Sequence, residues 1–503
     1  MALFLSALLC VTLTISLVTL LKFYVSFFLY YPPGPIPLPI IGNFHQMRFN
    51  DLIGSFAEFG RRYGPVFTLH FPQRMVVISD YEIMREALVK NGDAFANRPQ
   101  TAVTRAIYGT EYGIILTRGS SWREQRRFAL QTLRDFGLGR SEIEPKIYES
   151  CQQLFDELMI ASQRRSAYDP AAALELATAN VMNQLLVGRT FNDDLETFND
   201  LKRCVDETFK ASASLVARLG PIRNNEAFYR YFAGEIEAKR RELLLLERSA
   251  TEPTDYAGAF LKRWATLDAA GRRHSFSMPQ LLQCLVDLWQ AGMETTLTTL
   301  QWAFLFMLQY PHVQQEIRDE IHSKIGPHRL PKLADQSVLL YTVAALNEAQ
   351  RLANIGSVNL FRETTRDVMV GGYRLRKGTV IQPQIPVSKN ERVLGSTICP
   401  WTPVVLWDDR LFPTPKRFDP SRYLQKADAE NNSHPLVTPF FGMGKRECPG
   451  KSLGRAELFL IVARVLQQFE LFPEPGTPLP TERDVREGLT RKPGLYRMIV
   501  RKI

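Results

Sequence analysis

The most informative stretch of the chain reads Phe441-Gly-Met-Gly-Lys-Arg-Glu-Cys-Pro-Gly450. Its single cysteine, Cys448, lies in a loop punctuated by glycines, which allow the backbone to fold tightly against a flat partner. The cations Lys445 and Arg446 favour the thiolate over the thiol. An apolar, helix-forming run follows at residues 453–469, and a helix there would direct amide donors at the sulfur. A lone thiolate in this setting suits an axial ligand of haem iron.

This stretch resembles the haem-binding loop of the cytochrome P-450 family at each diagnostic position. The matching residues are Phe441, Gly444, Arg446, Cys448 and Gly450. A lone cysteine in a loop is usually structural or incidental, but the ten-residue pattern before a helix near the C-terminus reverses that expectation. The resemblance covers essentially the whole chain after the first helix. It implies that Cys448 is the metal ligand of haem b (iron protoporphyrin IX) and that Phe441 helps to bind the haem.

Composition and charge narrow the classes of protein. The 503 residues allow one large domain or three small ones, and the net charge of +10 suggests an acidic partner or an anionic membrane surface. Lys and Arg are scattered, and no zinc-finger or RNA-binding signature appears, so we expect no nucleic-acid partner. Six cysteines without paired spacing argue against a disulfide framework and structural zinc, and they indicate a reducing, cytosolic face.

The N-terminal segment is predicted to lie outside the globular fold. Residues 1–21 carry no charge, and Lys22 is the only charged residue before Arg48. About 20 apolar residues suffice to span a bilayer, and the short core and small-residue cleavage site of a signal peptide are not evident. We therefore predict a membrane anchor at residues 1–31 and contact with membrane lipid, with a buried core helix as the alternative.

Alternate prolines at residues 32–39 hold the next segment extended and make it stiff. This segment matches the family's hinge between anchor and catalytic domain, although a generic stiff linker would show the same pattern of prolines. No clear linker divides the chain afterwards, so residues 40–503 are predicted to form one catalytic domain.

The pattern of apolar residues predicts a mainly α fold with small β-sheets (α+β), preceded by one transmembrane helix. Residues 66–71 and 75–79 are typical of a hairpin. From residue 81 to about residue 325 the periodicity is mostly helical. Short strands return at residues 365–383, and residues 495–501 form a last strand. The resemblance implies the cytochrome P-450 fold.

A long helix is predicted at residues 278–310, with Ser277 as its N-cap and Pro311 at its end. Thr295 can bond back to the carbonyl of Ala291, four residues earlier. By itself this segment would be read as a tolerated glycine, Gly292, beside an exposed Glu294. The segment nevertheless resembles the family's oxygen-binding groove. The resemblance implies that Gly292 lets dioxygen approach the backbone, that Thr295 hydrogen-bonds the activated oxygen, and that Glu294 helps to relay protons.

Glu348 and Arg351 lie three residues apart on one helix face, a spacing that usually means a surface salt bridge. With Arg422 they resemble the family's buried Glu–Arg–Arg cluster, and we assign the three a structural role.

Haem propionates need cationic partners in a mostly apolar pocket. The resemblance implies that Trp122 and Arg126 contact a propionate, although a basic amphipathic surface helix is the general alternative. Further candidates are Arg98, Arg362 and Arg446. A basic face for an acidic flavoprotein reductase is predicted from other cations, namely Arg123, Arg127, Arg134, Arg140 and Lys445.

An apolar set of residues resembles the family's substrate pocket but is equally credible as ordinary core. Its members are Ile114, Ile115, Leu116, Ala291, Val358 and Leu360. Compared with the family pattern, the chain carries about 17 extra residues at 387–403, a stretch without clear periodicity. We interpret the insertion as a mis-spliced or retained-intron segment, with a genuine surface loop as the alternative.

The resemblance implies a membrane-anchored haem-thiolate monooxygenase of the microsomal animal type. It would insert one oxygen atom from dioxygen into a lipophilic substrate, with electrons from NADPH through a separate flavoprotein reductase. The catalytic domain would face the cytosol from the endoplasmic reticulum membrane. The alternatives are a haem-thiolate isomerase or peroxygenase without a reductase, and a catalytically silent haem-binding protein.

Overall fold

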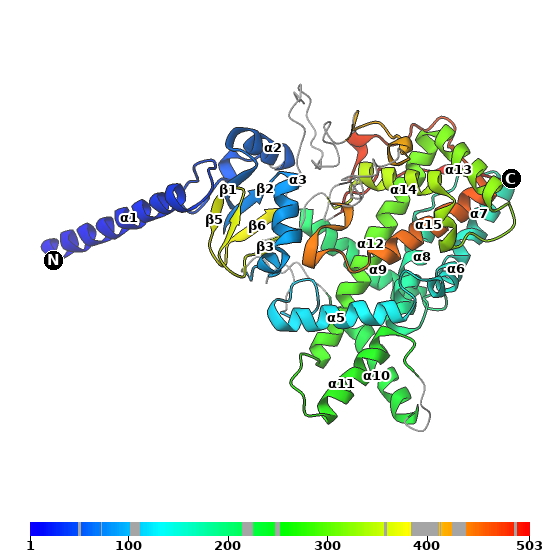
Figure 1. The fold of residues 1–503 in the computed structure, drawn as a ribbon, viewed down its shortest axis with the longest axis horizontal. Coiled ribbons are helices and arrows are strands. Elements are labelled where there is room, and N and C mark those ends of the chain that lie inside the picture. The colour runs from blue at the N-terminus through cyan, green and yellow to red at the C-terminus, as the bar shows by residue number, and fades with distance from the viewer. Residues whose placement is uncertain are drawn as a thin grey trace. The chain divides into compact units, whose positions relative to one another are not determined.

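The computed structural model describes residues 1–48, 52–71, 73–100, 111–213, 225–246, 252–356, 360–383, 412, 414–424, 439–486 and 490–503 (Figure 1). Helices dominate and the sheets are small, so the predicted fold class is confirmed. The insertion hypothesis at residues 387–403 and the pocket candidate Val358 lie outside the described residues.

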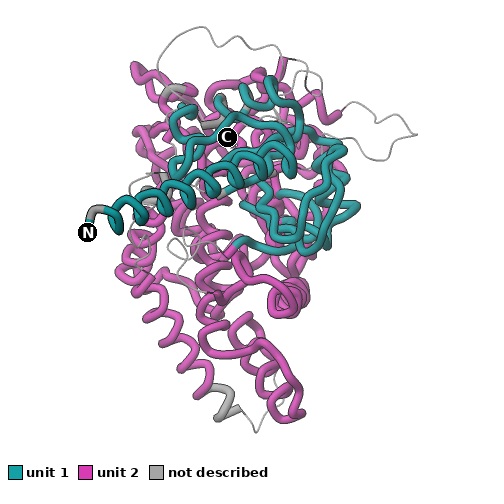
Figure 2. The backbone as a smooth tube through the Cα atoms, turned by 90° about the vertical axis from the view of Figure 1, so that its left-hand side faces the viewer, with its two compact units in different colours: residues 1–99, 358–410, 442–447 teal, residues 100–357, 411–441, 448–503 magenta. Residues whose placement is uncertain are grey.

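The chain divides into two compact units (Figure 2). Unit 1 comprises residues 1–99, 358–410 and 442–447, and unit 2 comprises residues 100–357, 411–441 and 448–503. A compact unit need not fold alone, so the division into an anchor, a hinge and one catalytic domain stays a prediction.

Unit 1 contains the N-terminal helix, short helical segments and two sheets. Its helical segments are α1 (Ala2–Tyr30), η1 (Phe44–Gln46), α2 (Leu52–Tyr63), α3 (Tyr81–Arg85), η2 (Glu86–Lys90), η3 (Gly92–Phe95) and η10 (Gly444–Arg446). Its strands are β1 (Val66–Phe71), β2 (Gln73–Ile78), β3 (Arg362–Glu363), β4 (Val368–Val370), β5 (Tyr373–Leu375) and β6 (Val380–Pro383).

The larger sheet of unit 1 has the strand order β1-β2-β6-β3. The β1–β2 and β6–β3 pairs are antiparallel, and the β2–β6 pair is parallel. Phe67 and Leu69 from β1 and Val77 from β2 are fully buried beside Phe59 of α2. The predicted hairpin is confirmed, but β2 begins at Gln73 rather than at residue 75, because Phe71 already pairs with Gln73 across the turn.

The proline-rich segment at residues 32–39 is docked on β1. The Thr68 amide donates to the carbonyl of Pro33 at 2.9 Å, and the Thr68 hydroxyl donates to the carbonyl of Pro32 at 2.8 Å. A Cβ atom on Gly34 would lie 2.0 Å from the Thr68 carbonyl oxygen, so a glycine is required at this contact. The stiffness of the segment stays a prediction, but its main chain is bonded to the sheet.

Helix α1 is, among the described residues, the one helix long and apolar enough to cross a membrane. Its C-terminal end packs against strand β2 of the larger sheet. Arg74 of β2 donates to the Ser26 hydroxyl at 2.9 Å, and its guanidinium lies 4.5 Å from the ring centroid of Tyr31 and 5.7 Å from that of Phe23. Phe27 is buried. The last turns of the helix are therefore held by the sheet as well as by the chain that follows.

The described part of unit 2 is helical apart from one two-stranded sheet. Its helical segments are α5 (Gly119–Asp135), η4 (Ser141–Ile143), α6 (Glu144–Ser150), α7 (Gln152–Arg164), α8 (Ala171–Val187), α9 (Leu195–Ala213), α10 (Glu226–Leu246), α11 (Tyr256–Ala269), α12 (Met278–Gln309), α13 (Pro311–Lys324), η6 (Leu333–Ser337), α14 (Leu340–Ala353), η7 (Pro420–Tyr423), η9 (Pro439–Phe441), α15 (Lys451–Gln468) and η11 (Glu482–Asp484). Its strands are β7 (Phe469–Pro473) and β8 (Met498–Lys502), which pair antiparallel.

Helix α12 runs through unit 2 (Figure 1), and α8, α10, α14 and α15 all pack against it. The Ser277 hydroxyl caps its start by accepting from the Gln280 amide, and Pro311 begins the next helix. Both predicted ends are confirmed within one residue. Helix α14, which carries Glu348 and Arg351, begins at Leu340 after η6 has ended at Ser337.

The Glu348 carboxylate joins α14 to the segment around η7. Arg351 donates to both of its oxygens, at 2.7 and 2.8 Å, and Arg422 Nε donates at 3.3 Å. The Glu348 and Arg351 side chains are fully buried. The predicted cluster of three charges is thus confirmed, and it connects residues 74 positions apart in the sequence.

We expect Glu348→Ala to lower the free energy of unfolding by about 3–5 kcal/mol, because it leaves two buried guanidinium groups without their carboxylate. The measurement is urea unfolding, together with the haem content per polypeptide, which should fall. Asp200→Ala is the control, since Asp200 and Arg203 have the same three-residue spacing on an exposed face of α9, and it should cost less than about 1 kcal/mol. Wild-type stability and haem content in Glu348→Ala would contradict the structural role.

Candidate functional site

The cysteine loop lies directly before α15. The Cys448 amide donates to the carbonyl of Phe441 at 2.8 Å, which closes the loop. Cys448 is exposed and is not part of a disulfide. Helix α15 begins at Lys451, so the predicted helix after the cysteine is confirmed, and its N-terminal amides lie on the side of the thiol. Phe441 packs its ring under the guanidinium of Arg455, 5.6 Å from the centroid.

The middle of the cysteine loop, residues 442–447, belongs to unit 1 and is glycine-dependent. Gly444 has φ +68°, and a Cβ atom on it would lie 1.7 Å from the carbonyl oxygen of Leu88 in η2. No other residue type fits this close approach of two backbones. Lys445, on the same turn, lies 3.7 Å from Asp93.

Three of the predicted propionate partners come together within unit 1. Arg446 Nε donates to the carbonyl of Ala96 at 2.7 Å, next to Arg98 in the sequence. Arg98 donates to the carbonyls of Leu360 and Phe361, at 3.1 and 2.6 Å. Arg362 donates to the carbonyl of Met443 at 3.3 Å.

All three of these arginines are buried, and the bonds just described go to main-chain carbonyl oxygens. Three segments distant in sequence therefore converge, and each brings a guanidinium group. Carboxylate groups of a ligand are natural partners for such a concentration of positive charge.

Trp122 and Arg126, the other predicted pair, lie one turn apart on α5 in unit 2. The Arg126 guanidinium lies 5.9 Å from the Trp122 ring centroid. Trp122 is buried, whereas Arg123 and Arg127, each about 100° further around the helix than the residue before it, are exposed. Helix α5 begins at Gly119, so the predicted helix is confirmed with an earlier start.

The middle of α12 has one accessible face in an otherwise buried helix. Ala291 is exposed and Thr295 is partly exposed, while Met293, Glu294, Thr296 and Leu297 are buried. The Thr295 hydroxyl donates to the carbonyl of Ala291 at 2.7 Å, as predicted. The small side chain of Ala291 and the hydroxyl group of Thr295 thus form the accessible face of this helix.

Gly292 also has a packing role that the sequence did not reveal. A Cβ atom at this position would lie 2.3 Å from the Met182 sulfur of α8. The glycine therefore allows α8 and α12 to approach closely, and its effect on dioxygen binding stays a prediction.

Glu294 is not the exposed carboxylate that its sequence alone would suggest. It is buried, and its Oε1 atom lies 2.6 Å from Lys492 Nζ and accepts from the Thr490 hydroxyl at 3.1 Å. Burial raises the pKa of this carboxyl group, and the charge of Lys492 opposes that rise. Sequence reasoning missed Lys492 and Thr490, because 196 and more residues separate them from their partner.

Asp287 is a second residue that sequence reasoning missed. Its Oδ2 atom accepts from the amides of Ile114 and Ile115, at 2.9 and 3.1 Å, and its Oδ1 atom accepts from Gln283 at 2.7 Å. The side chain is buried on α12. A charged residue seven positions before Glu294, in a strongly apolar helix, is the sequence signal that points to it.

The loop fixed by Asp287 contains three of the predicted pocket residues. Ile114 and Leu116 are buried, while Ile115 is partly exposed. Leu360, in unit 1, is 37% exposed. These positions are compatible with a lining role, but that role stays a prediction.

The donor groups fit haem b. Cys448 offers an exposed sulfur at a helix N-terminus, which suits an axial thiolate ligand. Ala291 and Thr295 leave a shallow face on α12, and the arginines offer partners for two carboxylates. We find no mismatch between these residues and that cofactor.

We expect Asp287→Asn to destabilise the protein by about 1–3 kcal/mol, because an amide nitrogen would replace one acceptor facing the Gln283 amide or the two backbone amides. Hydrogen exchange at Ile114 and Ile115 and thermal unfolding are the measurements. Asp156→Asn is the matched control, since Asp156 accepts from Gln152 with the same four-residue spacing on an exposed face. Unchanged exchange at both amides would show that Asp287 does not fix this loop.

Comparison with known proteins agrees with this geometry. Residues 32–392 and 394–500 match the family model described as Cytochrome P450. Cytochrome P450 2H2 of Gallus gallus is 33% identical over 460 residues, which cover 88% of this chain and 87% of that protein. Cytochrome P450 2B19 of Mus musculus is 32% identical over 93% of both chains. Cytochrome P450 2K4 of Oncorhynchus mykiss is 33% identical over 90% of this chain and 87% of its own length.

These relatives confirm the resemblance drawn from the cysteine loop. The match is continuous apart from one residue within the predicted insertion, and it begins where the proline-rich segment begins. Since the likeness extends from residue 32 to residue 500, this chain belongs to the cytochrome P450 family of haem-dependent monooxygenases.

Proposed function

We propose that this cytochrome P450 is a membrane-bound monooxygenase that inserts one oxygen atom from dioxygen into a lipophilic substrate. Its electrons come from NADPH through a separate flavoprotein reductase. The observation that carries the proposal is the exposed Cys448 thiol at the start of α15, closed onto Phe441 by a main-chain hydrogen bond.

When bound, haem b would be held by the Cys448 thiolate and would supply the iron that activates dioxygen. Phe441 covers one side of the loop, and Arg98, Arg362 and Arg446 neutralise carboxylates from within unit 1. Trp122 and Arg126 provide a second polar contact from α5. In this assignment the arginines position the cofactor, and none of them takes part in bond making.

The accessible face of α12 handles dioxygen and protons. Thr295 donates its hydroxyl proton to the Ala291 carbonyl, which leaves its oxygen lone pairs directed away from the helix backbone. The hydroxyl can then accept a hydrogen bond or hold a water molecule on this face. Gly292 keeps the backbone accessible at the same turn, and Glu294 supplies a carboxylate for proton relay.

The substrate class follows from the residues around this face. Ile114, Ile115 and Leu116 are apolar, and Asp287 accepts from the amides of Ile114 and Ile115, so that the loop presents hydrocarbon rather than polar backbone. Such a lining favours lipophilic molecules. It does not distinguish among fatty acids, steroids and foreign compounds.

A row of arginines on α5 supports a docking site for an acidic reductase. Arg123, Arg127 and Arg134 are exposed and share one helix face, because their spacings of 4 and 7 residues correspond to whole turns. Arg140, just after the helix, is also exposed. Complementary charge increases the association rate of electron-transfer partners.

Helix α1 supports a location in the endoplasmic reticulum membrane with a single anchor, as in the microsomal type that the sequence resembles. The absence of paired cysteine spacing favours a cytosolic orientation of the catalytic part.

The first test is the carbon monoxide difference spectrum of the dithionite-reduced protein. We expect a red-shifted, thiolate-type Soret band, and we expect Cys448→Ser to abolish it because the anionic sulfur ligand is lost. Cys10→Ser is the control, since Cys10 is also exposed but lies in α1. Persistence of the band in Cys448→Ser would refute the ligand assignment.

The same measurement, made with and without residues 387–403, tests the insertion. A thiolate band in the full-length protein shows that the insertion is tolerated. A band in the shortened protein alone identifies the insertion as an artefact or as an inactivating isoform.

The reductase site predicts a charge effect. Arg123→Glu together with Arg127→Glu should raise the concentration of reductase needed for half-maximal NADPH oxidation by about tenfold at low salt. The difference should shrink near 1 M salt, where the Debye length is about 3 Å. Arg240→Glu with Arg241→Glu, on exposed positions of α10, is the matched control. Equal effects of the two double variants would argue against docking on α5.

A further inference from the structure

Three side chains of α12, namely Gln280, Gln283 and Asp287, lie against the loop at residues 113–116. Their spacings of three and four residues place them on one face of the helix, and all three are buried. A Cβ atom on Gly113 would lie 2.2 Å from Asp287 Oδ2 and 2.8 Å from Gln283 Cγ, and the φ angle of this glycine is +89°. The backbone of the loop therefore rests directly on these side chains.

Gln280 is oriented by the loop itself. Its Nε2 atom donates to the Gly113 carbonyl at 3.0 Å, and its Oε1 atom accepts from the Gly113 amide at 3.2 Å. The main chain of one residue thus satisfies both ends of the side-chain amide. Gln280 therefore takes its direction from the loop that it holds.

Gln283 takes its direction from a different helix. The Tyr229 hydroxyl of α10 donates to Gln283 Oε1 at 2.6 Å, and Gln283 Nε2 donates to Asp287 Oδ1 at 2.7 Å. Asp287 Oδ2 in turn accepts from the amides of Ile114 and Ile115. A carboxylate only accepts, so Gln283 must turn its NH₂ group to Asp287 and its oxygen to a donor. Tyr229 supplies that donor, and the three side chains form a relay that ends at the loop.

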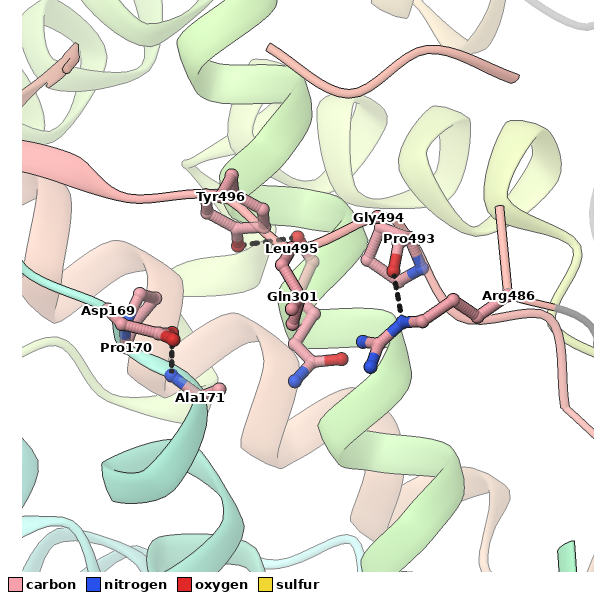
Figure 3. A pocket seen from close by; sticks show the side chains of 9 residues that line it. All are labelled: Asp169, Pro170, Ala171, Gln301, Arg486, Pro493, Gly494, Leu495 and Tyr496. Atoms are coloured by element: carbon pink, nitrogen blue, oxygen red, sulfur yellow. Dashed lines mark hydrogen bonds between the residues drawn. The ribbon is translucent and has the colours of Figure 1, made fainter. Parts of the chain in front are cut away.

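Gln301 on the same helix shows an amide without such a donor. It lies 18 residues after Gln283, which is about five turns, so the two side chains share a face of α12. Figure 3 shows its side chain in the pocket that Asp169 and Arg486 also line. Among the residues that the structure describes, no donor reaches its buried Oε1 atom. A glutamine on this face can therefore lack a donor, and the contact with Tyr229 is particular to Gln283.

The start of α10, which carries Tyr229, is held on α12 by contacts of its own. The Gln290 side chain donates to Asn225 Oδ1 at 3.3 Å. The Phe228 ring is fully buried and lies 5.1 Å from the Trp289 ring in an edge-to-face arrangement. The Tyr229 hydroxyl is therefore presented to Gln283 from a backbone whose position does not depend on the loop.

We propose that Tyr229 is a positioning residue for substrate binding, because its hydroxyl group fixes the Gln283 amide and, through it, the Asp287 carboxylate that holds the loop. Without the hydroxyl, the Gln283 amide can rotate, and its oxygen would then face the carboxylate and repel it. Asp287 would lose its fixed orientation, and the partly exposed Ile115 would lose its fixed place. This inference rests on the proposed function, in which the loop lines the substrate pocket.

The first test measures hydrogen exchange of the loop in the full-length protein and does not depend on turnover. We expect Tyr229→Phe to increase exchange of the peptide that contains Ile114 and Ile115 by about fivefold, since one hydrogen bond of the relay is lost. Gln283→Met should do the same. Tyr229→Phe should add nothing to the effect of Asp287→Asn, because both changes act on one relay.

Two variants control for a general loss of stability. Tyr148→Phe removes another partly buried hydroxyl of unit 2, which donates to the Pro331 carbonyl at 2.6 Å, and it should leave exchange of the loop unchanged. Gln301→Met removes a buried glutamine of α12 that no described donor orients, and it should also leave the loop unchanged. Wild-type exchange in Tyr229→Phe, or an equal increase in Tyr148→Phe, would overturn the proposal.

The second test titrates the haem-loaded protein with two iron-binding probes, imidazole and 4-phenylimidazole, and follows the difference spectrum. Both probes bring an imidazole nitrogen to the iron, but only 4-phenylimidazole adds a ring that contacts an apolar lining. We expect Tyr229→Phe to weaken binding of 4-phenylimidazole by about threefold or more and to leave binding of imidazole unchanged. Equal weakening of both probes would contradict a role in the pocket.

The two tests fail separately. If neither probe shifts the haem spectrum of the wild type, the proposed function fails, while hydrogen exchange still decides whether Tyr229 fixes the loop. Increased exchange in Tyr229→Phe with unchanged binding of 4-phenylimidazole would overturn the role in substrate binding.

Discussion

The constraint on which unit 2 depends is that α12 is buried on nearly all sides and yet carries polar side chains. A buried donor or acceptor must find a partner, and in α12 those partners are irregular segments from elsewhere in the chain. Asp287 fixes the loop at residues 114–115, Glu294 fixes Lys492, and Trp302 fixes Arg491. The helix thus positions the segments at residues 114–115 and 491–492 through polar contacts, in addition to its apolar packing.

In unit 1 the corresponding buried side chains are positively charged, and they too bond to irregular segments of the chain. Buried guanidinium groups from three distant segments donate to main-chain carbonyls that no strand or helix satisfies. Each arginine therefore stabilises an irregular turn and leaves a positive charge close to the cysteine loop. The same side chains therefore satisfy main-chain carbonyls and supply positive charge. Arginine suits both tasks better than lysine, because its planar guanidinium group donates in several directions at once.

The sequence predicted those features that depend on local pattern. The hairpin, the ends of α12, the helix after Cys448 and the return bond from Thr295 to Ala291 all follow from spacing, capping and turn chemistry, and all are present. The Glu348 cluster was predictable only through the family resemblance, because its third member is 74 residues away from the first. Lys492 and Asp287 were missed, since their partners are set by tertiary packing. The Met182 contact of Gly292 was missed for the same reason, because a glycine in a helix does not reveal which neighbour requires it.

The docking of the proline-rich segment changes what the N-terminal helix does mechanically. A flexible tether would let the sheet of unit 1 take any orientation relative to the bilayer. Here the Arg74 guanidinium contacts the rings of Phe23 in α1 and of Tyr31 just after it, and the prolines are bonded to β1, so the end of the helix is joined to the sheet by side-chain and main-chain contacts. The tilt of a transmembrane helix responds to bilayer thickness. Where α1 spans a bilayer, a change in its tilt would therefore be passed on to the sheet, and membrane thickness would influence the orientation of unit 1.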